Sequence, residues 1–167
     1  MSCAPCLVFC WTKPVSDLMR QLYSPSHVAH HMLAIYALGA NRTLLREGYD
    51  NDEDDQRPIG KSPEPISDAN FANHLGDGKY YQGYLEFFSN QLVTKGIHKT
   101  LKVYLYSKGA NFDDRAKADS SQPEMFCRFM SGLMHPLIHV GNGLEFGLLG
   151  VLAEGTYFWI QPSECVE

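Results

Sequence analysis

Hydrophobic and polar positions along most of the chain repeat with the period of an α-helix. The clearest predicted helix lies between Ser26, which can cap its first turn, and Gly39, which can end it. One stripe of this helix, with residues spaced at i, i+3 and i+4, is mostly apolar and includes a histidine. Its members are Val28, His31, Met32, Ile35 and Leu38. The pattern therefore predicts that His31 points toward the protein core.

Further helices are predicted downstream, separated by segments rich in glycine, proline and acidic residues. A short helix over Arg42–Glu47 precedes an acidic loop, and another over residues 69–75 ends at two glycines. The segment KYYQGYLEFFSNQLVTKG (79–96) carries apolar residues near the helical period and ends in a glycine. From 97 to 107 the apolar positions fit a helix or a strand about equally, and we assign a helix because the neighbouring segments are helical.

Two helices are predicted in the last third of the chain. Pro123 suits the first turn of a long helix through EMFCRFMSGLMHPLIHV (124–140), and a second covers LEFGLLGVLAEG (144–155). Pro136 lies inside the first of these, so we expect a kink near Gly132. The glycines of GNG (141–143) are expected to end that helix and to let two helices approach closely. Because there is no repeat and no set of alternating strands, the chain is predicted to be all-α, an irregular multi-helix bundle.

Length and composition restrict the classes of protein that this sequence can be. The 167 residues suit one domain, and 44% hydrophobic with 20% charged residues is typical of a globular protein. A net charge of -5 gives no electrostatic reason to expect nucleic acid as a partner. No apolar run reaches the roughly 20 residues that span a membrane, and no secretory signal is apparent. We therefore expect no membrane partner and a cytoplasmic location.

Histidines in apolar helical segments are the main candidates for chemistry. His135 and His139 are spaced to share one helix face, and their neighbours are apolar enough to bury that face. A buried imidazole needs a partner, and neutral imidazole is a common ligand for iron, zinc and copper. The alternative is a pair of histidines that are hydrogen-bonded in the core. Both interpretations stay open on the sequence pattern.

Glu145 follows shortly after, within the apolar segment GLEFGLL. An apolar setting can raise the pKa of its carboxyl group or prepare it to accept a hydrogen bond from an imidazole. The alternative is a glutamate in the first turn of a helix after Gly143, where the helix dipole favours a negative charge. Both interpretations remain open.

Two other motifs fail on their spacing. The acidic segment 50–55 begins like a calcium loop, but Asp55 occupies the position of the required glycine and Lys61 that of the final glutamate. The segment GNGLEFG (141–147) approaches a dinucleotide fingerprint, yet its third glycine is one position late and a helix precedes it. Neither a calcium site nor a flavin or nicotinamide fold follows from these residues.

Four segments together resemble a known family. HHMLAIYALGA, QRPI, NHLGDGKYYQGYLEFF and SGLMHPLIHVGNGLEFG occur in this order and are similar to the questin oxidase-like family of fungal and bacterial proteins. Its members include Baeyer-Villiger oxidases of anthraquinone and aflatoxin-type polyketide pathways. The resemblance implies a questin oxidase-like helical domain over 26–155, flanked by a divergent N-terminal segment (1–25) and a divergent tail (156–167). Because members are much longer, it also implies a truncated part of a larger helical fold.

The resemblance further implies an oxidoreductase that performs oxygen-dependent oxidation, either Baeyer-Villiger-like or ring-cleaving, of polycyclic aromatic ketones or quinones in secondary metabolism. NADPH serves at least some members, and no flavin is expected. One ring-cleaving member holds a non-haem iron through several histidines and a carboxylated lysine. The matching metal ligands here are His31 (or His30), His74, His135 and His139. Glu145, from its apolar segment, remains the catalytic candidate. The lysine has no counterpart in this sequence.

Other hypotheses remain alongside this one. The aromatic residues Tyr80, Tyr84 and Phe87 would hold a flat substrate, or they form an ordinary core. The same ligands would suit a zinc hydrolase with Glu145 as its base, although no HExxH spacing is present. A third hypothesis is a catalytically incomplete helical remnant that acts as a binding protein. Such a remnant would leave helix faces uncovered and would self-associate through them.

Overall fold

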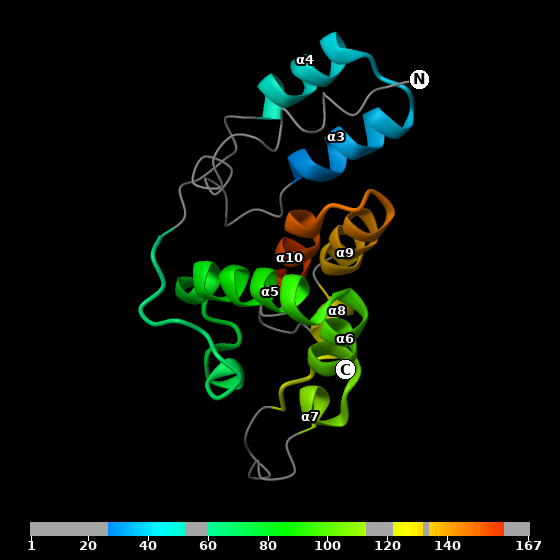
Figure 1. Cartoon of the computed structure of the whole chain (residues 1–167). Helices are drawn as coiled ribbons and strands as arrows, with labels where there is room; N and C mark the ends of the chain where they lie inside the picture. The colour runs from blue at the N-terminus through cyan, green and yellow to red at the C-terminus, as the bar shows by residue number, and fades with distance from the viewer. Residues whose placement is uncertain (1–26, 53–59, 113–121, 132–133, 159–167) are drawn as a thin grey trace. The chain divides into compact units, whose positions relative to one another are not determined.

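The computed structural model describes residues 27–52, 60–112, 122–131 and 134–158 (Figure 1). Every regular element in these ranges is helical, and they contain no strand, so the all-α prediction is confirmed. The chain divides into two compact units, residues 1–59 and 60–167. Within the described ranges, each helix is too short or too polar to cross a lipid bilayer.

The first unit contains a pair of packed helices, α3 (His27–Ala37) and α4 (Arg42–Asp52). The chain turns between them at Gly39, whose φ of 86° is a left-handed conformation that glycine adopts without a steric penalty. The predicted stop after α3 is thus confirmed. Helix α4 begins where predicted but continues past Glu47, and Arg46 pairs with Asp50 across the added turn at 3.1 Å. The acidic segment therefore begins as helix.

The second unit opens with two 3-10 turns, η2 (Phe71–His74) and η3 (Gly78–Tyr80), followed by α5 (Tyr81–Lys95). The helix predicted over 69–75 is therefore a single short turn. Next come α6 (Ile97–Leu101), a π-helical turn η4 (Lys102–Tyr106) and α7 (Lys108–Asn111). The assignment of helix to residues 97–107 is confirmed.

The long helix predicted over 124–140 is two helices, α8 (Met125–Met130) and α9 (His135–Glu145). Met134 adopts a left-handed conformation with φ of 63° directly before α9, and Pro136 lies in the first turn of that helix. Proline lacks an N–H that the first turn does not use, so it begins this helix instead of kinking a longer one. The predicted kink is wrong for this reason.

Helix α9 also continues through both glycines of GNG and ends at Glu145, so the predicted stop at these glycines is wrong as well. The turn falls later, at Gly147, whose φ is 67°. The last helix, α10 (Leu149–Phe158), follows and packs against both α9 and α5. Its start is therefore about one turn later than the sequence pattern indicates.

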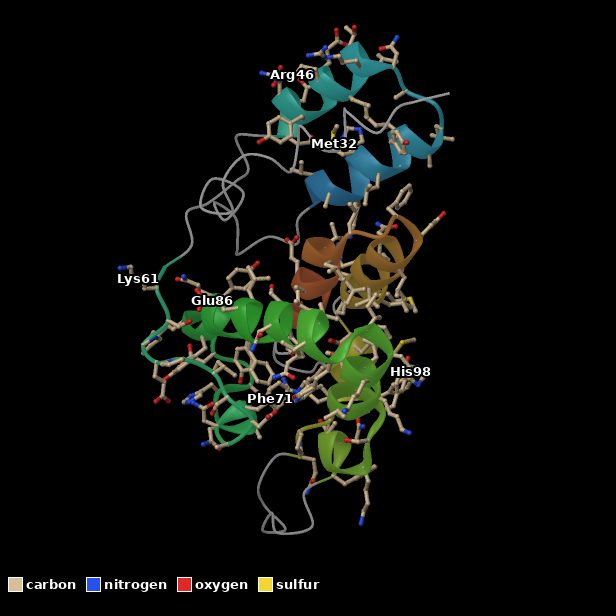
Figure 2. All side chains as sticks on the ribbon, viewed as in Figure 1. Met32, Arg46, Lys61, Phe71, Glu86 and His98 are labelled. Atoms are coloured by element: carbon tan, nitrogen blue, oxygen red, sulfur yellow. The ribbon has the colours of Figure 1, made fainter. Side chains whose placement is uncertain are left out.

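An aromatic cluster forms the core beside α5. Ring centroids in this cluster lie 5.3–5.8 Å apart, many of them edge to face, which is a favourable arrangement for aromatic pairs. Figure 2 shows Phe71, which comes from η2, among the side chains below α5 in that view. Tyr84 is fully buried and Phe87 is 8% exposed, which favours the core interpretation of these two residues over a substrate wall. The members are Phe71, Tyr84, Phe87, Phe88 and Tyr104.

Candidate functional site

Helices α9 and α10 approach each other closely at two glycines. A Cβ atom on Gly143 would lie 2.8 Å from the backbone nitrogen of Leu152, and one on Gly155 would lie 2.8 Å from Cβ of His139. Both separations are shorter than any ordinary carbon contact, so neither position accepts a side chain without displacing a backbone. The predicted close approach of two helices is confirmed at Gly143, and it brings α10 against His139.

The imidazole of His139 is fully buried at this crossing. Its Nδ1 lies 3.2 Å from the carbonyl oxygen of His135, one turn earlier on α9. Because a carbonyl oxygen can only accept a hydrogen bond, Nδ1 carries the proton and donates it there. In the neutral ring, Nε2 then carries the lone pair. His135 itself is half-buried, so the predicted shared face of the two histidines exists, although their contact runs through the backbone of His135.

Glu154 of α10 is the carboxylate near this imidazole. Its Oε1 lies 3.8 Å from Nε2 of His139, a separation longer than a hydrogen bond but within the range of an ion pair. Burial raises the pKa of the Glu154 carboxyl to about 7, because the low-dielectric surroundings disfavour its charged form. Glu154 can therefore hold or release a proton near neutral pH.

Glu154 was not among the predicted site residues, although its sequence context carries a signal. It is the one acidic residue in the apolar run LLGVLAEG, the same kind of signal that drew attention to Glu145 in GLEFGLL. The period of the pattern does not tell which of two such glutamates faces a histidine on another helix.

Glu145 has neither of the environments expected for it. Its side chain is exposed, so it does not lie in an apolar setting. It is also the last residue of α9, whereas the alternative placed it in the first turn of a helix. The reason is that α9 passes through Gly143 without stopping. Glu154 instead provides the carboxylate beside an imidazole.

His31 belongs to the first unit and is not directed into a core. Its side chain is 44% exposed, and its Nδ1 lies 2.7 Å from Oδ2 of Asp52 at the end of α4. Among the residues of α3 whose burial is described, Leu33 is the buried one at 4% exposed, while Leu38 of the predicted stripe is 87% exposed. A Cβ atom on Gly48 of α4 would lie 3.0–3.6 Å from Ile35, Met32 and the His31 ring, so the predicted stripe faces α4. His31 shares this face but remains partly exposed, so it is not enclosed in a core.

His74 of η2 is partly buried and faces two neighbours. Its ring stacks on that of Tyr80, with centroids 3.8 Å apart and planes 12° from parallel. Its Nε2 lies 2.8 Å from Oε1 of Glu64, at hydrogen-bond distance but without the alignment of a hydrogen bond. Like His31 and His139, His74 therefore lies beside a carboxylate of its own.

Of the four histidines predicted to bind a metal, three lie in the second unit, and these three do not meet at one point. Among the residues that the structure describes, no three histidine, cysteine, aspartate or glutamate side chains come together where they could hold one ion. His74 and His139 face different carboxylates, Glu64 and Glu154. His139 with Glu154 nevertheless combines imidazole and carboxylate, the ligand types found in non-haem iron and zinc sites. Iron itself stays a prediction.

Comparison with known proteins decides the family. A family model described as questin oxidase-like matches residues 25–156. The chain belongs to the questin oxidase-like family. This questin oxidase-like chain carries both the crossing of α9 with α10 and the His139–Glu154 pair inside the matched region.

Several curated relatives of the questin oxidase-like chain are similar at about the same level. The Baeyer-Villiger oxidase ptaJ of Pestalotiopsis fici is 29% identical over 141 residues, which cover 81% of this chain and 30% of that protein. The questin oxidase of Aspergillus terreus is 29% identical over 140 residues, covering 81% and 29%. The oxidoreductase AflY of Aspergillus parasiticus is 29% identical over 126 residues, covering 72% and 23%. The chain spans less than a third of the length of these relatives.

Proposed function

We propose that this chain acts as an oxygen-dependent oxidoreductase of the questin oxidase type, which oxidises polycyclic aromatic ketones or quinones in secondary metabolism. The observation that carries the proposal is the family match over 25–156, together with relatives named as questin oxidases and Baeyer-Villiger oxidases. A Baeyer-Villiger-like or a ring-cleaving reaction both fit this family. A cytoplasmic location is part of the same proposal.

The proposed reaction needs both electrons and protons. A Baeyer-Villiger oxidation inserts one atom of dioxygen beside a carbonyl carbon, and the other atom leaves as water after NADPH supplies two electrons. Glu154 supports such chemistry because its largely buried carboxyl, with a pKa raised to about 7 by that burial, can hold a proton at Oε near neutral pH. The neighbouring imidazole of His139 is held in one orientation by the His135 carbonyl.

Iron is the proposed metal, and within the second unit two groups fit it. His139 Nε2 and Glu154 Oε1 lie 3.8 Å apart, the histidine fully buried and the glutamate 19% exposed, and imidazole with carboxylate is a donor set that iron accepts. When bound, iron would supply the one-electron chemistry that dioxygen requires. Of the further ligands in the prediction, His31 and His74 each lie against another carboxylate, at 2.7 Å and 2.8 Å, and His135 contributes its carbonyl to His139.

The activity can be tested directly with the purified chain. The protein is incubated with a hydroxylated anthraquinone, NADPH and ¹⁸O₂. The products are then separated, and their molecular masses are measured by mass spectrometry. We expect a product that carries one ¹⁸O atom for a Baeyer-Villiger-like reaction or two for a ring cleavage by a dioxygenase. An Aspergillus terreus questin oxidase sample is the positive control. Turnover by that control without any labelled product from this chain would contradict the proposal.

A binding or interaction role is a second candidate. It is favoured by a group of exposed apolar side chains in the second unit, which we call the η4–α8 patch. Two of its rings, Tyr106 and Phe126, lie 6.0 Å apart. Exposed apolar groups of this kind often mark a surface that contacts another protein. The patch consists of Val103 (40% exposed), Tyr106 (58%), Phe126 (48%) and Met130 (41%).

A further inference from the structure

Two tyrosines of the aromatic cluster are buried, but their hydroxyl groups have different hydrogen-bond acceptors. Tyr104 is 5% exposed and donates to the carboxylate of Asp68. Tyr84 is fully buried and donates to the backbone carbonyl oxygen of Phe71 at 2.6 Å, and the backbone of His74 forms a second hydrogen bond with it. A carboxylate is a base that can take up a proton, whereas a peptide carbonyl only accepts a hydrogen bond. Of these two tyrosines, Tyr104 is therefore the one that can transfer its proton to its acceptor.

The carboxylate of Asp68 is held in position and also reaches water. Asn70 closes the turn that carries it. The Asn70 side chain accepts a hydrogen bond from the Ser67 backbone N–H at 2.7 Å and donates one to the Pro65 carbonyl oxygen at 3.0 Å. The Asp68 side chain is 68% exposed. Because an exposed carboxylate is ionised at neutral pH, it can accept the proton of Tyr104 and exchange it with solvent.

The ring of Tyr104 is enclosed by rings that are harder to oxidise. The centroids of Phe71 and Phe87 each lie 5.3 Å from its own, and phenylalanine loses an electron much less readily than tyrosine. Enclosure also keeps a radical on this ring from coupling with a radical on another molecule, which is how exposed tyrosyl radicals are consumed. Tyr104 belongs to η4, and single π-helical turns of this kind are uncommon and frequently found at functional sites.

The ammonium group of Lys95 makes the loss of an electron depend on the loss of the proton. Its Nζ lies 3.2 Å from the Tyr104 hydroxyl oxygen and 5.5 Å from the ring centroid. A ring that lost only an electron would carry a positive charge beside this ammonium, which is electrostatically unfavourable. Transfer of the phenol proton to Asp68 in the same step leaves the ring neutral. Lys95, whose Nζ lies 3.8 Å from Oδ2 of Asp68, can then still donate to the phenol oxygen.

We propose that Tyr104 and Asp68 form a reversible one-electron redox site. A strong one-electron oxidant removes one electron from the Tyr104 ring, the phenol O–H bond breaks, and the proton forms a new O–H bond on the Asp68 carboxylate. The products are a neutral phenoxyl radical, a neutral carboxylic acid and an oxidant reduced by one electron. Return of one electron and the same proton restores the starting groups. Oxidising radicals derived from dioxygen belong to this class of oxidant, and that this chain meets them rests on the proposed function.

Photochemical oxidation of the whole chain tests the redox site. Tris(bipyridine)ruthenium(II), excited by a laser flash in the presence of a cobalt(III) electron acceptor, becomes a ruthenium(III) oxidant that is strong enough to oxidise tyrosine. Optical absorption and electron paramagnetic resonance then follow the phenoxyl radicals. Exposed tyrosines and tryptophans also react, but their radicals couple and disappear. We expect a long-lived radical to remain, and we assign it to Tyr104.

Substitutions identify the two groups of the site. Tyr104→Phe should lose the long-lived radical, whereas Tyr84→Phe, which removes the other buried hydroxyl of the cluster, is the matched control and should keep it. Asp68→Asn preserves the shape of the side chain but removes the base. We expect it to form the radical at least roughly ten-fold more slowly, because a positioned proton acceptor contributes about 10²–10⁴-fold to rates. Asp68→Glu restores a carboxylate and should recover part of the rate.

Three outcomes would overturn the proposal. They are a wild-type chain without a long-lived radical, a folded Tyr104→Phe variant that keeps it, and a folded Asp68→Asn variant that forms it at the wild-type rate. Circular dichroism checks that each variant is folded. A further measurement needs no variant, because a proton that moves with the electron makes radical formation slower in D₂O than in H₂O. Equal rates in the two solvents would contradict the coupled transfer.

The redox site and the proposed function can fail independently of each other. If the Tyr104 radical forms but no anthraquinone is oxidised, the redox site stands and the proposed activity falls. If anthraquinone is oxidised and folded Tyr104→Phe keeps the long-lived radical, the activity stands and the redox site falls.

Discussion

The buried carboxyl of Glu154 makes the stability of the fold depend on pH. Its ordinary pKa is 4.5, and burial raises the pKa to about 7 in the folded chain. Between these two values the folded state binds the proton more tightly than the unfolded state does. The free energy of unfolding should therefore be highest at low pH within this window, fall as pH rises from 4.5 to about 7, and level off above.

This pH dependence can be isolated by substitution. Urea denaturation of the wild type and of Glu154→Gln is measured from pH 5 to pH 8. Relative to the variant, we expect the wild type to lose roughly 1–3 kcal/mol over this range, because only the wild type carries the titrating carboxyl. Glu145→Gln should keep the wild-type dependence. Parallel curves for the wild type and Glu154→Gln would contradict the prediction.

A second polar contact links the segment before η2 to the helices of the second unit. The Tyr104 hydroxyl, on a residue that is 5% exposed, donates a hydrogen bond to Asp68. It also accepts one from Lys95 Nζ at 3.2 Å. Burial, and next the hydrogen bond to Asp68, raises the pKa of the Tyr104 phenol above its ordinary value. The hydroxyl therefore remains protonated and acts as a donor.

Removal of this hydroxyl should destabilise the protein. We expect Tyr104→Phe to lower the free energy of unfolding by about 1–2 kcal/mol, because a hydrogen bond to a charged group is lost. Tyr106→Phe removes a hydroxyl from a ring that is 58% exposed and should change stability by less than about 0.5 kcal/mol. Equal effects of the two substitutions in urea denaturation would show that the Tyr104–Asp68 contact does not contribute.

Among single residues, sequence reasoning located part of the site. The apolar neighbours of His139 correctly predicted that its imidazole is buried. For His31, the predicted stripe does face α4, but the imidazole at its edge remains partly exposed. Glu145 was preferred and Glu154 missed, since an acid in an apolar run can lie on the exposed or the buried face of its helix. Local pattern alone does not distinguish these cases.

The crossing of α9 and α10 depends on glycine at one position and tolerates change at another. Gly143 faces the backbone of Leu152, where an added Cβ would be 2.8 Å from its nitrogen. Gly141 lies two residues earlier on the same helix and has no atom within 4 Å of an added Cβ. These two positions form a matched pair for testing the helix contact.

We predict opposite effects for alanine at the two positions. Gly143→Ala should lower the free energy of unfolding by about 1–3 kcal/mol, because the helices must separate to admit the methyl group. Gly141→Ala should raise it by about 0.5–1 kcal/mol, since alanine loses less backbone entropy than glycine in a helix. Thermal and urea denaturation measure both. A neutral or stabilising Gly143→Ala would contradict the close contact.

The helices themselves were largely predictable, and their junctions were less so. The starts of α3 and α4 and the extent of α5 follow from apolar period and from glycines that end helices. At Pro136 two rules compete, because proline either kinks a helix or begins one. A proline inside a helix costs about 3 kcal/mol, and a new helix that starts at His135 avoids this cost. The left-handed Met134 that permits the break has no sequence signature.

Across the whole molecule, uncovered apolar surface is the feature that bears on assembly. The η4–α8 patch (Val103, Tyr106, Phe126 and Met130) remains exposed in the chain. Its members come from two elements that pack together, so they form a joint surface. We expect this surface to drive self-association, because contact between copies removes apolar area from water.

The prediction is a molar mass that rises with concentration. Light scattering after size-exclusion chromatography should show this for the wild type, whereas the double variant Tyr106→Gln, Phe126→Gln should stay monomeric. Val93→Gln, which changes a side chain 73% exposed on α5, is the control and should behave as the wild type. A wild-type chain that is monomeric at every concentration would contradict the interaction role.

The helical period, the all-α fold and the membership of the questin oxidase-like family can all be read from the order of residues, because each depends on local spacing or on motifs. The residue that lies against His139 cannot be read from the order of residues. Spacing shows which residues share a helix face, but it does not show what lies opposite that face. Glu154 reaches His139 from fifteen positions away because Gly143 and Gly155 let α10 cross α9 at close range. That contact is decided by packing, which depends on how the side chains of both helices fit together.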